Sequence, residues 1–233
     1  MRQSIPIVLI PGLGASPRLY AEQIPSLWCV GPVMVAQHAL DESMAEIARR
    51  LLEAAPPRFA LIGLSMGGYI AFEVMRQAAE RVFRLGLLDT SARPDMPEQS
   101  EGRRAQIALA EAGRLAEVMD SQIPRLVHPR RVDDRPLGAL LRQMADEVGA
   151  AGFVRQQRAI MGRPDSRPDL SRIRCPTLVL VGEQDALTPP ARAEEMAAGI
   201  AGARLVVVPD CGHVSSLEQP QAVTRALLEL LES

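Results

Sequence analysis

The sequence contains no lysine and no asparagine, so all 26 of its basic residues are arginine. Without lysine the chain cannot form a Walker-type phosphate loop, a Schiff base or a lysine general base. Without asparagine it has no acceptor for N-glycosylation. The 26 basic and 28 acidic residues give a formal net charge of −2 and form no long run of either sign. This charge pattern does not indicate a nucleic-acid-binding surface.

Cysteine is scarce as well. Cys29, Cys175 and Cys211 are widely spaced and show none of the short paired spacings of zinc or thioredoxin-like sites. We therefore expect no metal site, and a reducing compartment is the simplest context. The apolar stretch in residues 1–10 is too short for a secretory signal, and no later segment approaches the ~18 apolar residues of a membrane span. These features predict a cytoplasmic protein without a membrane partner.

The length of 233 residues suits one domain that carries an insertion. Six short apolar runs, each followed by a segment of helical period, predict an α/β fold with a mostly parallel, doubly wound sheet of about six strands. The runs are Ile5–Ile10, Val33–Ala36, Phe59–Gly63, Leu85–Leu88, Thr177–Val181 and Leu205–Val208.

The alternation of strand and helix stops after Asp89. Residues 92–174 show helical periodicity without a convincing strand, and two short helices are expected around Ile107–Leu115 and Leu137–Met144. We predict that residues 1–91 and 175–233 form the core and that residues 92–174 form a helical insertion.

A glycine-rich motif marks the candidate nucleophile. The third apolar run continues into Gly63-Leu64-Ser65-Met66-Gly67-Gly68 and then into a helical pattern. A nucleophile at a sharp strand-to-helix turn needs small neighbours, which Gly63 and Gly67 provide, and such a turn exposes the Ser65 hydroxyl. The alternative is an ordinary glycine-rich loop.

A serine nucleophile requires a base and a group that orients the base. The chain has three histidines, and His213 follows the last predicted strand, whereas His38 and His128 suit solvent-exposed or structural roles better. Asp185 follows the fifth predicted strand, although Glu183 is a second possible acid and Asp185 could simply cap a turn. A carboxylate there would hold the His213 tautomer and stabilise the imidazolium.

Ser65, Asp185 and His213 follow one another along the chain in the order nucleophile, acid, base, which is the order of the α/β-hydrolase fold. The sequence resembles the α/β-hydrolase superfamily over nearly its whole length. Within that superfamily it resembles the branch with a helical cap between the sixth and seventh of the family's eight strands. The first apolar run leaves no room for the leading hairpin of many relatives, so six strands are expected instead of eight. The pieces that carry the resemblance are Gly63–Gly68, Gly182–Asp185 with Pro189, and Gly212-His213 with Glu218 and Pro220.

Relatives often place His-Gly after their first core strand, where this chain has Pro11-Gly12-Leu13-Gly14. Because oxyanion donors are backbone N–H groups, the exchange need not abolish the site. Gly12 and Gly14 would let the loop bring the Leu13 N–H toward the substrate carbonyl, with the Met66 N–H as second donor. A plain loop or a partial nucleotide-binding turn is the alternative.

The resemblance implies a serine hydrolase that cleaves a carboxylic ester of a small or medium substrate through an acyl-enzyme formed by Ser65, Asp185 and His213, without metal or organic cofactor. The cap would roof a mainly apolar pocket for this small-molecule substrate. Candidate pocket residues are Gly12, Tyr69, Leu109, Phe153, Met161 and Leu187.

The same three residues also fit a lactonase, a thioesterase, a C–C bond hydrolase or a cofactor-free haloperoxidase-like enzyme. Haloalkane dehalogenase and epoxide hydrolase relatives are disfavoured, because they carry aspartate at the nucleophile position. A non-catalytic ligand-binding protein of the same fold is the alternative from another functional class.

Overall fold

The structure is a computed structural model that describes residues 4–232. These residues form six strands in one sheet, in the order β2-β1-β3-β4-β5-β6, and every adjacent pair is parallel. The predicted parallel sheet is therefore confirmed. The strands are β1 (Ile7–Ile10), β2 (Val33–Val35), β3 (Phe59–Leu64), β4 (Val82–Leu88), β5 (Thr177–Gly182) and β6 (Arg204–Val208).

Three strand starts differ from the expected ones, and for β6 the difference is one residue, Arg204 instead of Leu205. β1 begins at Ile7 rather than Ile5, since Pro6 has no N–H to donate to a neighbouring strand. β4 begins at Val82, three residues before the predicted start, because Val82 already pairs with Phe59 across a register shift.

Helices cover both faces of the sheet, as its strand pattern requires. On one face, Val8 belongs to an apolar cluster that includes residues of α2 (Met44–Ala54), α3 (Met66–Ala78) and α7 (Pro190–Gly199). On the other face, its neighbour Leu9 belongs to a cluster that includes residues of α1 (Ile24–Trp28) and α9 (Pro220–Glu232). The helices are α1 (Ile24–Trp28), α2 (Met44–Ala54), α3 (Met66–Ala78), α4 (Pro97–Glu111), α5 (Leu115–Leu126), α6 (Arg135–Met161), α7 (Pro190–Gly199), α8 (Ser215–Glu218) and α9 (Pro220–Glu232). Short 3-10 helices are η1 (Pro17–Tyr20), η2 (Ala79–Arg81), η3 (Pro129–Arg131) and η4 (Arg167–Arg172).

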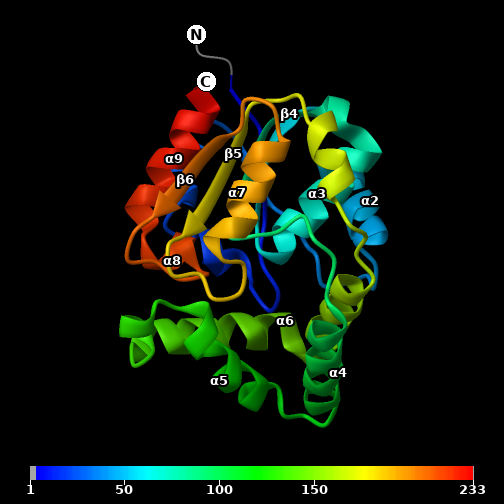
Figure 1. The fold of residues 1–233 in the computed structure, drawn as a ribbon, viewed down its shortest axis with the longest axis vertical. Helices are drawn as coiled ribbons and strands as arrows, with labels where there is room; N and C mark the ends of the chain where they lie inside the picture. The colour runs from blue at the N-terminus through cyan, green and yellow to red at the C-terminus, as the bar shows by residue number, and fades with distance from the viewer. Residues whose placement is uncertain (1–3, 233) are drawn as a thin grey trace.

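Three helices, α4 to α6, occupy the interval between β4 and β5, where two short helices were expected. The helix expected around Ile107–Leu115 is divided at Gly113, which has φ 78° and separates α4 from α5. The second extends to 27 residues in α6 and has a non-helical residue, Gly149, within it. The three helices lie together at the end of the sheet toward which the β5 and β6 arrowheads point (Figure 1).

These helices share an apolar cluster of their own that includes Val118 and Phe153. No helix within residues 4–232 is long and apolar enough to cross a membrane.

Candidate active site

Ser65 occupies the sharp turn between β3 and α3. Its φ of 57° and ψ of −116° are unusual for a residue with a side chain, and such strain is typical of functional turns. A Cβ at Gly63 would collide with the carbonyl oxygen of Gly67, and a Cβ at Gly67 with that of Ile10. The turn therefore depends on glycine at both positions, and it leaves the Ser65 side chain partly exposed.

The His213 ring lies between Ser65 and Asp185. Its Nε2 is 2.8 Å from the Ser65 Oγ, and its Nδ1 is 2.8 Å from the Asp185 Oδ2. The three residues follow β3, β5 and β6, whose carboxyl ends meet at one edge of the sheet. His213 and Asp185 are each 3 % exposed, so the hydrogen bond between them is buried, whereas the one to Ser65 is partly buried.

The loop after β5 holds the Asp185 carboxylate from several sides. Oδ1 accepts hydrogen bonds from the backbone N–H groups of Leu187 (2.8 Å) and Thr188 (2.9 Å). Oδ2 accepts one from the Thr188 hydroxyl (2.7 Å) in addition to its contact with His213. Glu183, the other candidate acid, is exposed and accepts from the neighbouring Gln184. Thr188 was not predicted as a site residue, because threonine near a turn has many ordinary roles.

Burial and charge act in opposite directions on this pair. Burial by itself would raise the pKa of Asp185, but the His213 charge and hydrogen bond hold that pKa below its usual value. Burial by itself would lower the pKa of His213, but the Asp185 carboxylate raises it above the usual value of 6.5. The pair therefore favours a proton on His213 once Asp185 is ionised.

The loop after β1 carries the Leu13 N–H, one of the two predicted oxyanion donors. The other, the Met66 N–H, belongs to the first residue of α3, and neither N–H donates to another residue in the described part of the chain. The Gly12 carbonyl accepts from His38 Nε2 (2.9 Å), and the Gly14 N–H donates to the Gln156 side chain (2.9 Å).

His38 is buried and not exposed to solvent. Burial lowers the pKa of His38, so the ring is neutral near pH 7, and its Nε2 donates because a carbonyl only accepts. The Gly12 carbonyl and the Leu13 N–H belong to one peptide unit, so His38 fixes the direction of that N–H. Sequence analysis missed this role because it depends on a contact across 26 residues.

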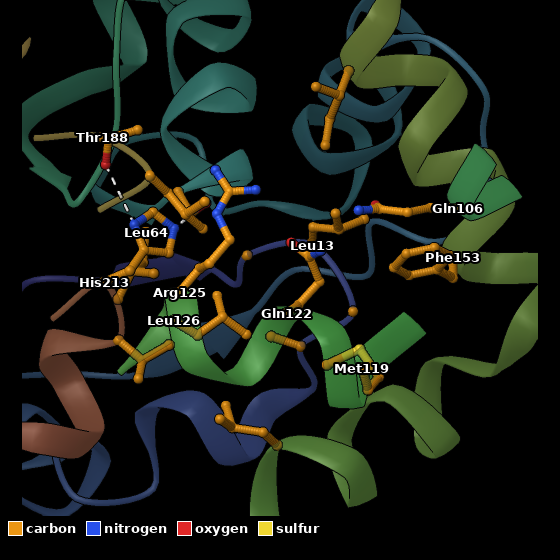
Figure 2. Close-up of a pocket in the computed structure, with 18 of the residues that line it drawn as sticks. Leu13, Leu64, Gln106, Met119, Gln122, Arg125, Leu126, Phe153, Thr188 and His213 are labelled. Atoms are coloured by element: carbon orange, nitrogen blue, oxygen red, sulfur yellow. Dashed lines mark hydrogen bonds between the residues drawn. The ribbon is translucent and has the colours of Figure 1, made fainter. Parts of the chain in front are cut away.

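A cavity of about 390 Å³ opens over Ser65 and His213, between the sheet edge and α4 to α6. Figure 2 shows the apolar side chains of Leu13, Phe153 and Met119 on one side of it, together with Gln106 and Gln122, and His213 with Thr188 on the other. The expected pocket residues that line it are Gly12, Tyr69, Phe153 and Leu187.

Two expected pocket residues, Leu109 and Met161, do not line the cavity. Both are partly buried and pack instead against the apolar cluster shared by α4, α5 and α6. Helical periodicity marks the apolar face of a helix, but it does not distinguish side chains that contact other helices from those that face a cavity.

Glu218 links the His213 loop to the end of α5. Its carboxylate accepts from the backbone N–H groups of Gly212 (2.8 Å) and His128 (2.7 Å). The Leu126 carbonyl in turn accepts from the His213 N–H (2.9 Å). The end of α5 is thus fixed against the loop that carries His213. His128 is likewise buried, with a structural rather than a solvent-exposed position.

Asp89 is a buried carboxyl group that sequence analysis did not select. It follows β4, is 0 % exposed, and accepts hydrogen bonds from the Gly182 N–H (2.9 Å) and the Ser215 hydroxyl. Burial, together with the charge of Asp185, raises the pKa of Asp89 from 3.8 to about 8. Asp89 is therefore mainly protonated near pH 7, next to an ionised Asp185.

The raised pKa of Asp89 predicts a loss of stability with rising pH. The unfolded chain releases this proton near pH 4 and the folded chain near pH 8, so the free energy of unfolding falls by up to about 1.4 kcal/mol per pH unit between these values. Asp89→Asn keeps an acceptor for Gly182 and removes the titration. We expect the Tm of this variant to exceed that of the wild type at pH 9 but not at pH 5.

The exposed Asp133→Asn substitution is the control, measured by thermal melts across the same pH range. An identical pH dependence of Tm in wild type and Asp89→Asn would contradict the burial of a protonated carboxyl group.

The sequence profile of the alpha/beta hydrolase family matches residues 7–226. A pimeloyl-[acyl-carrier protein] methyl ester esterase of Chromobacterium violaceum is 27% identical over 97% of this chain and 94% of that protein.

Two solved structures share the whole architecture. A thermophilic esterase from Thermogutta terrifontis, solved with malate bound, has a TM-score of 0.89 and 32% identity over 98% of this chain and 89% of that one. The enol-lactonase from Burkholderia xenovorans LB400 has a TM-score of 0.89 and 26% identity, over 99% and 91% respectively. The chain therefore belongs to the alpha/beta hydrolase family and has its fold.

Proposed function

We propose that this protein is a serine hydrolase that cleaves a carboxylic ester of a small or medium substrate through an acyl-enzyme. The observation that supports this most strongly is the His213 ring, with Nε2 2.8 Å from the Ser65 Oγ and Nδ1 2.8 Å from the Asp185 carboxylate. These contacts are those that a nucleophile, a base and an orienting acid require.

In the first half of the reaction, His213 Nε2 takes the Ser65 hydroxyl proton as Oγ attacks the ester carbonyl carbon. The carbonyl oxygen becomes an oxyanion, and Asp185 stabilises the imidazolium. When the tetrahedral intermediate collapses, the C–O bond to the alcohol breaks. His213 gives its proton to the leaving oxygen, and the acyl group stays on Ser65.

The Leu13 and Met66 N–H groups are the proposed donors to the oxyanion. Removing one such donor typically costs on the order of 100-fold or more in turnover. The hydrogen bond from the neutral His38 to the Gly12 carbonyl supports the Leu13 role, because it fixes the peptide unit before substrate arrives. Gln156 does the same on the far side of Leu13 through the Gly14 N–H.

In the second half, water enters where the alcohol left. His213 takes one water proton as the oxygen attacks the acyl carbon, and it returns that proton to the Ser65 Oγ when the acid product departs. No step requires a metal or an organic cofactor.

The substrate range follows from the cavity. Its volume of about 390 Å³ lies near the lower end of ligand pockets, and its wall carries apolar side chains such as Leu13 and Phe153. A lactone is a cyclic ester and would follow the same steps. The similarity to a solved enol-lactonase supports lactone hydrolysis as a second candidate function.

Active-site labelling tests the proposal. A fluorophosphonate probe phosphonylates an activated serine Oγ and releases fluoride, and we expect intact-protein and peptide mass spectrometry to locate one label on Ser65. Hydrolysis of p-nitrophenyl esters of graded chain length, assayed on the same sample, should fall in step with labelling. Labelling elsewhere, or full activity of a labelled enzyme, would refute the acyl-enzyme mechanism.

A further inference from the structure

Arg125 is a charged residue of the cavity wall that the proposed mechanism does not use. It lies in the last turn of α5 and lines the cavity together with Ser65 and His213. Figure 2 shows its side chain rising from α5 into the space between His213 and Leu13. It makes no hydrogen bond or ion pair with another residue in the described part of the chain.

The second arginine of the cavity wall, Arg103, differs in this respect. It donates to the Asp95 carboxylate (2.7 Å), which also pairs with Arg163, and to the Gln157 side chain (2.7 Å), so its guanidinium already has protein partners. Glu98 also lines the cavity, and within residues 4–232 no ion pair joins it to Arg125. Arg125 is therefore the arginine of this wall whose guanidinium is available to a ligand.

The backbone holds Arg125 close to the proposed catalytic groups. The next residue, Leu126, accepts hydrogen bonds through its carbonyl from the N–H groups of His213 (2.9 Å) and Val214 (3.2 Å). Glu218 fixes the same junction through the His128 N–H (2.7 Å). The guanidinium therefore extends from a rigid point beside the base, which suits it to position a substrate group.

We propose that Arg125 binds a free carboxylate on the substrate, so that the preferred ester or lactone is an anion with a short aliphatic chain. The inference rests on the proposed function and names its substrate class. A guanidinium matches a carboxylate in a two-point hydrogen-bonded pair. The apolar wall near Leu13, Phe153 and Met119 would hold the chain between the two functional groups.

The test compares two matched substrates. One is the monomethyl ester of a linear dicarboxylic acid, and the other carries an amide in place of the free carboxylate. We expect the wild type to favour the anion by about tenfold in kcat/KM, chiefly through KM, because a charge-assisted hydrogen-bonded pair is worth about one factor of ten when, as for Arg125, one partner is a solvent-exposed side chain. The preference should shrink at high salt.

Arg125→Gln should abolish this preference by lowering kcat/KM for the anion by about tenfold more than for the amide ester. Arg125→Lys should retain part of the preference, since it keeps the charge but loses the planar fork. Arg104→Gln is the matched control, because Arg104 is exposed on α4 and does not line the cavity. Equal losses on both substrates in Arg125→Gln, or no wild-type preference, would overturn the proposal.

A binding measurement separates this proposal from the proposed function. Titration of Ser65→Ala protein with the half-ester by calorimetry needs no turnover. We expect an added Arg125→Gln substitution to weaken binding about tenfold for the half-ester but not for its amide analogue. Loss of that difference would refute the role of Arg125, whereas labelling away from Ser65 would refute only the proposed chemistry.

Discussion

Ser65→Ala is expected to lower kcat for p-nitrophenyl ester hydrolysis by on the order of 10⁵-fold or more. In the proposed mechanism, alanine removes the atom that forms the acyl bond, and members of a nucleophile–base pair act as a unit, so losing one removes most of the catalysis. The N–H donors at Leu13 and Met66 would remain, and any residual rate would come from them and from substrate binding. Steady-state kinetics with single-turnover traces would measure the loss.

Ser121→Ala is the matched control, because Ser121 is exposed on α5 outside the cavity. Its activity should stay within about twofold of the wild type, and circular dichroism should show that both variants are folded. Wild-type activity in Ser65→Ala would remove Ser65 from the mechanism, whereas a wild type that hydrolyses none of these esters above the background rate would favour the ligand-binding alternative.

Asp185→Asn is expected to lower kcat by on the order of 10⁴-fold. The asparagine oxygen can still accept from the Leu187 and Thr188 N–H groups. Its amide nitrogen would then face His213 Nδ1 as a donor. His213 would have to carry its proton on Nε2, and it could not accept the proton of Ser65.

A pH–rate profile gives Asp185→Asn an independent readout. The carboxylate holds the pKa of His213 above 6.5. As the pH is lowered, wild-type kcat/KM should therefore begin to decline while the pH is still above 6.5, because the base becomes protonated. In the variant the acidic limb should move to lower pH. Glu183→Gln, at the exposed neighbouring acid, should change neither rate nor profile. The opposite ranking of the two variants would assign the acid to Glu183.

Several features of this fold could be predicted from the sequence because they depend on few neighbouring residues. Apolar runs such as Phe59–Leu64 define buried strands. The turn at Ser65 could be recognised because only glycine tolerates the backbone contacts at Gly63 and Gly67. Strand boundaries were less accurate, since β4 begins where Val82 finds a partner in Phe59.

Other features depend on which surfaces meet after folding. Phe153 and Met161 both lie on α6, yet Phe153 lines the cavity and Met161 packs against the neighbouring helices. His38 contacts a carbonyl 26 residues away, and the raised pKa of Asp89 results from complete burial near Asp185. None of these outcomes has a pattern in the nearby sequence.

The sequence by itself therefore determined the order of the six strands along the chain, the helical character of the segments between them and the glycine turn that presents Ser65, since each depends on backbone sterics and side-chain periodicity over a few residues. Only the tertiary structure decided that Asp185 rather than Glu183 contacts His213, and that Arg125 lines the cavity without a hydrogen-bond or ion-pair partner among residues 4–232. Those distances are set by how the carboxyl ends of β3, β5 and β6 converge and by how α5 docks on the His213 loop. Such docking depends on packing between segments far apart in the chain, which local sequence does not encode.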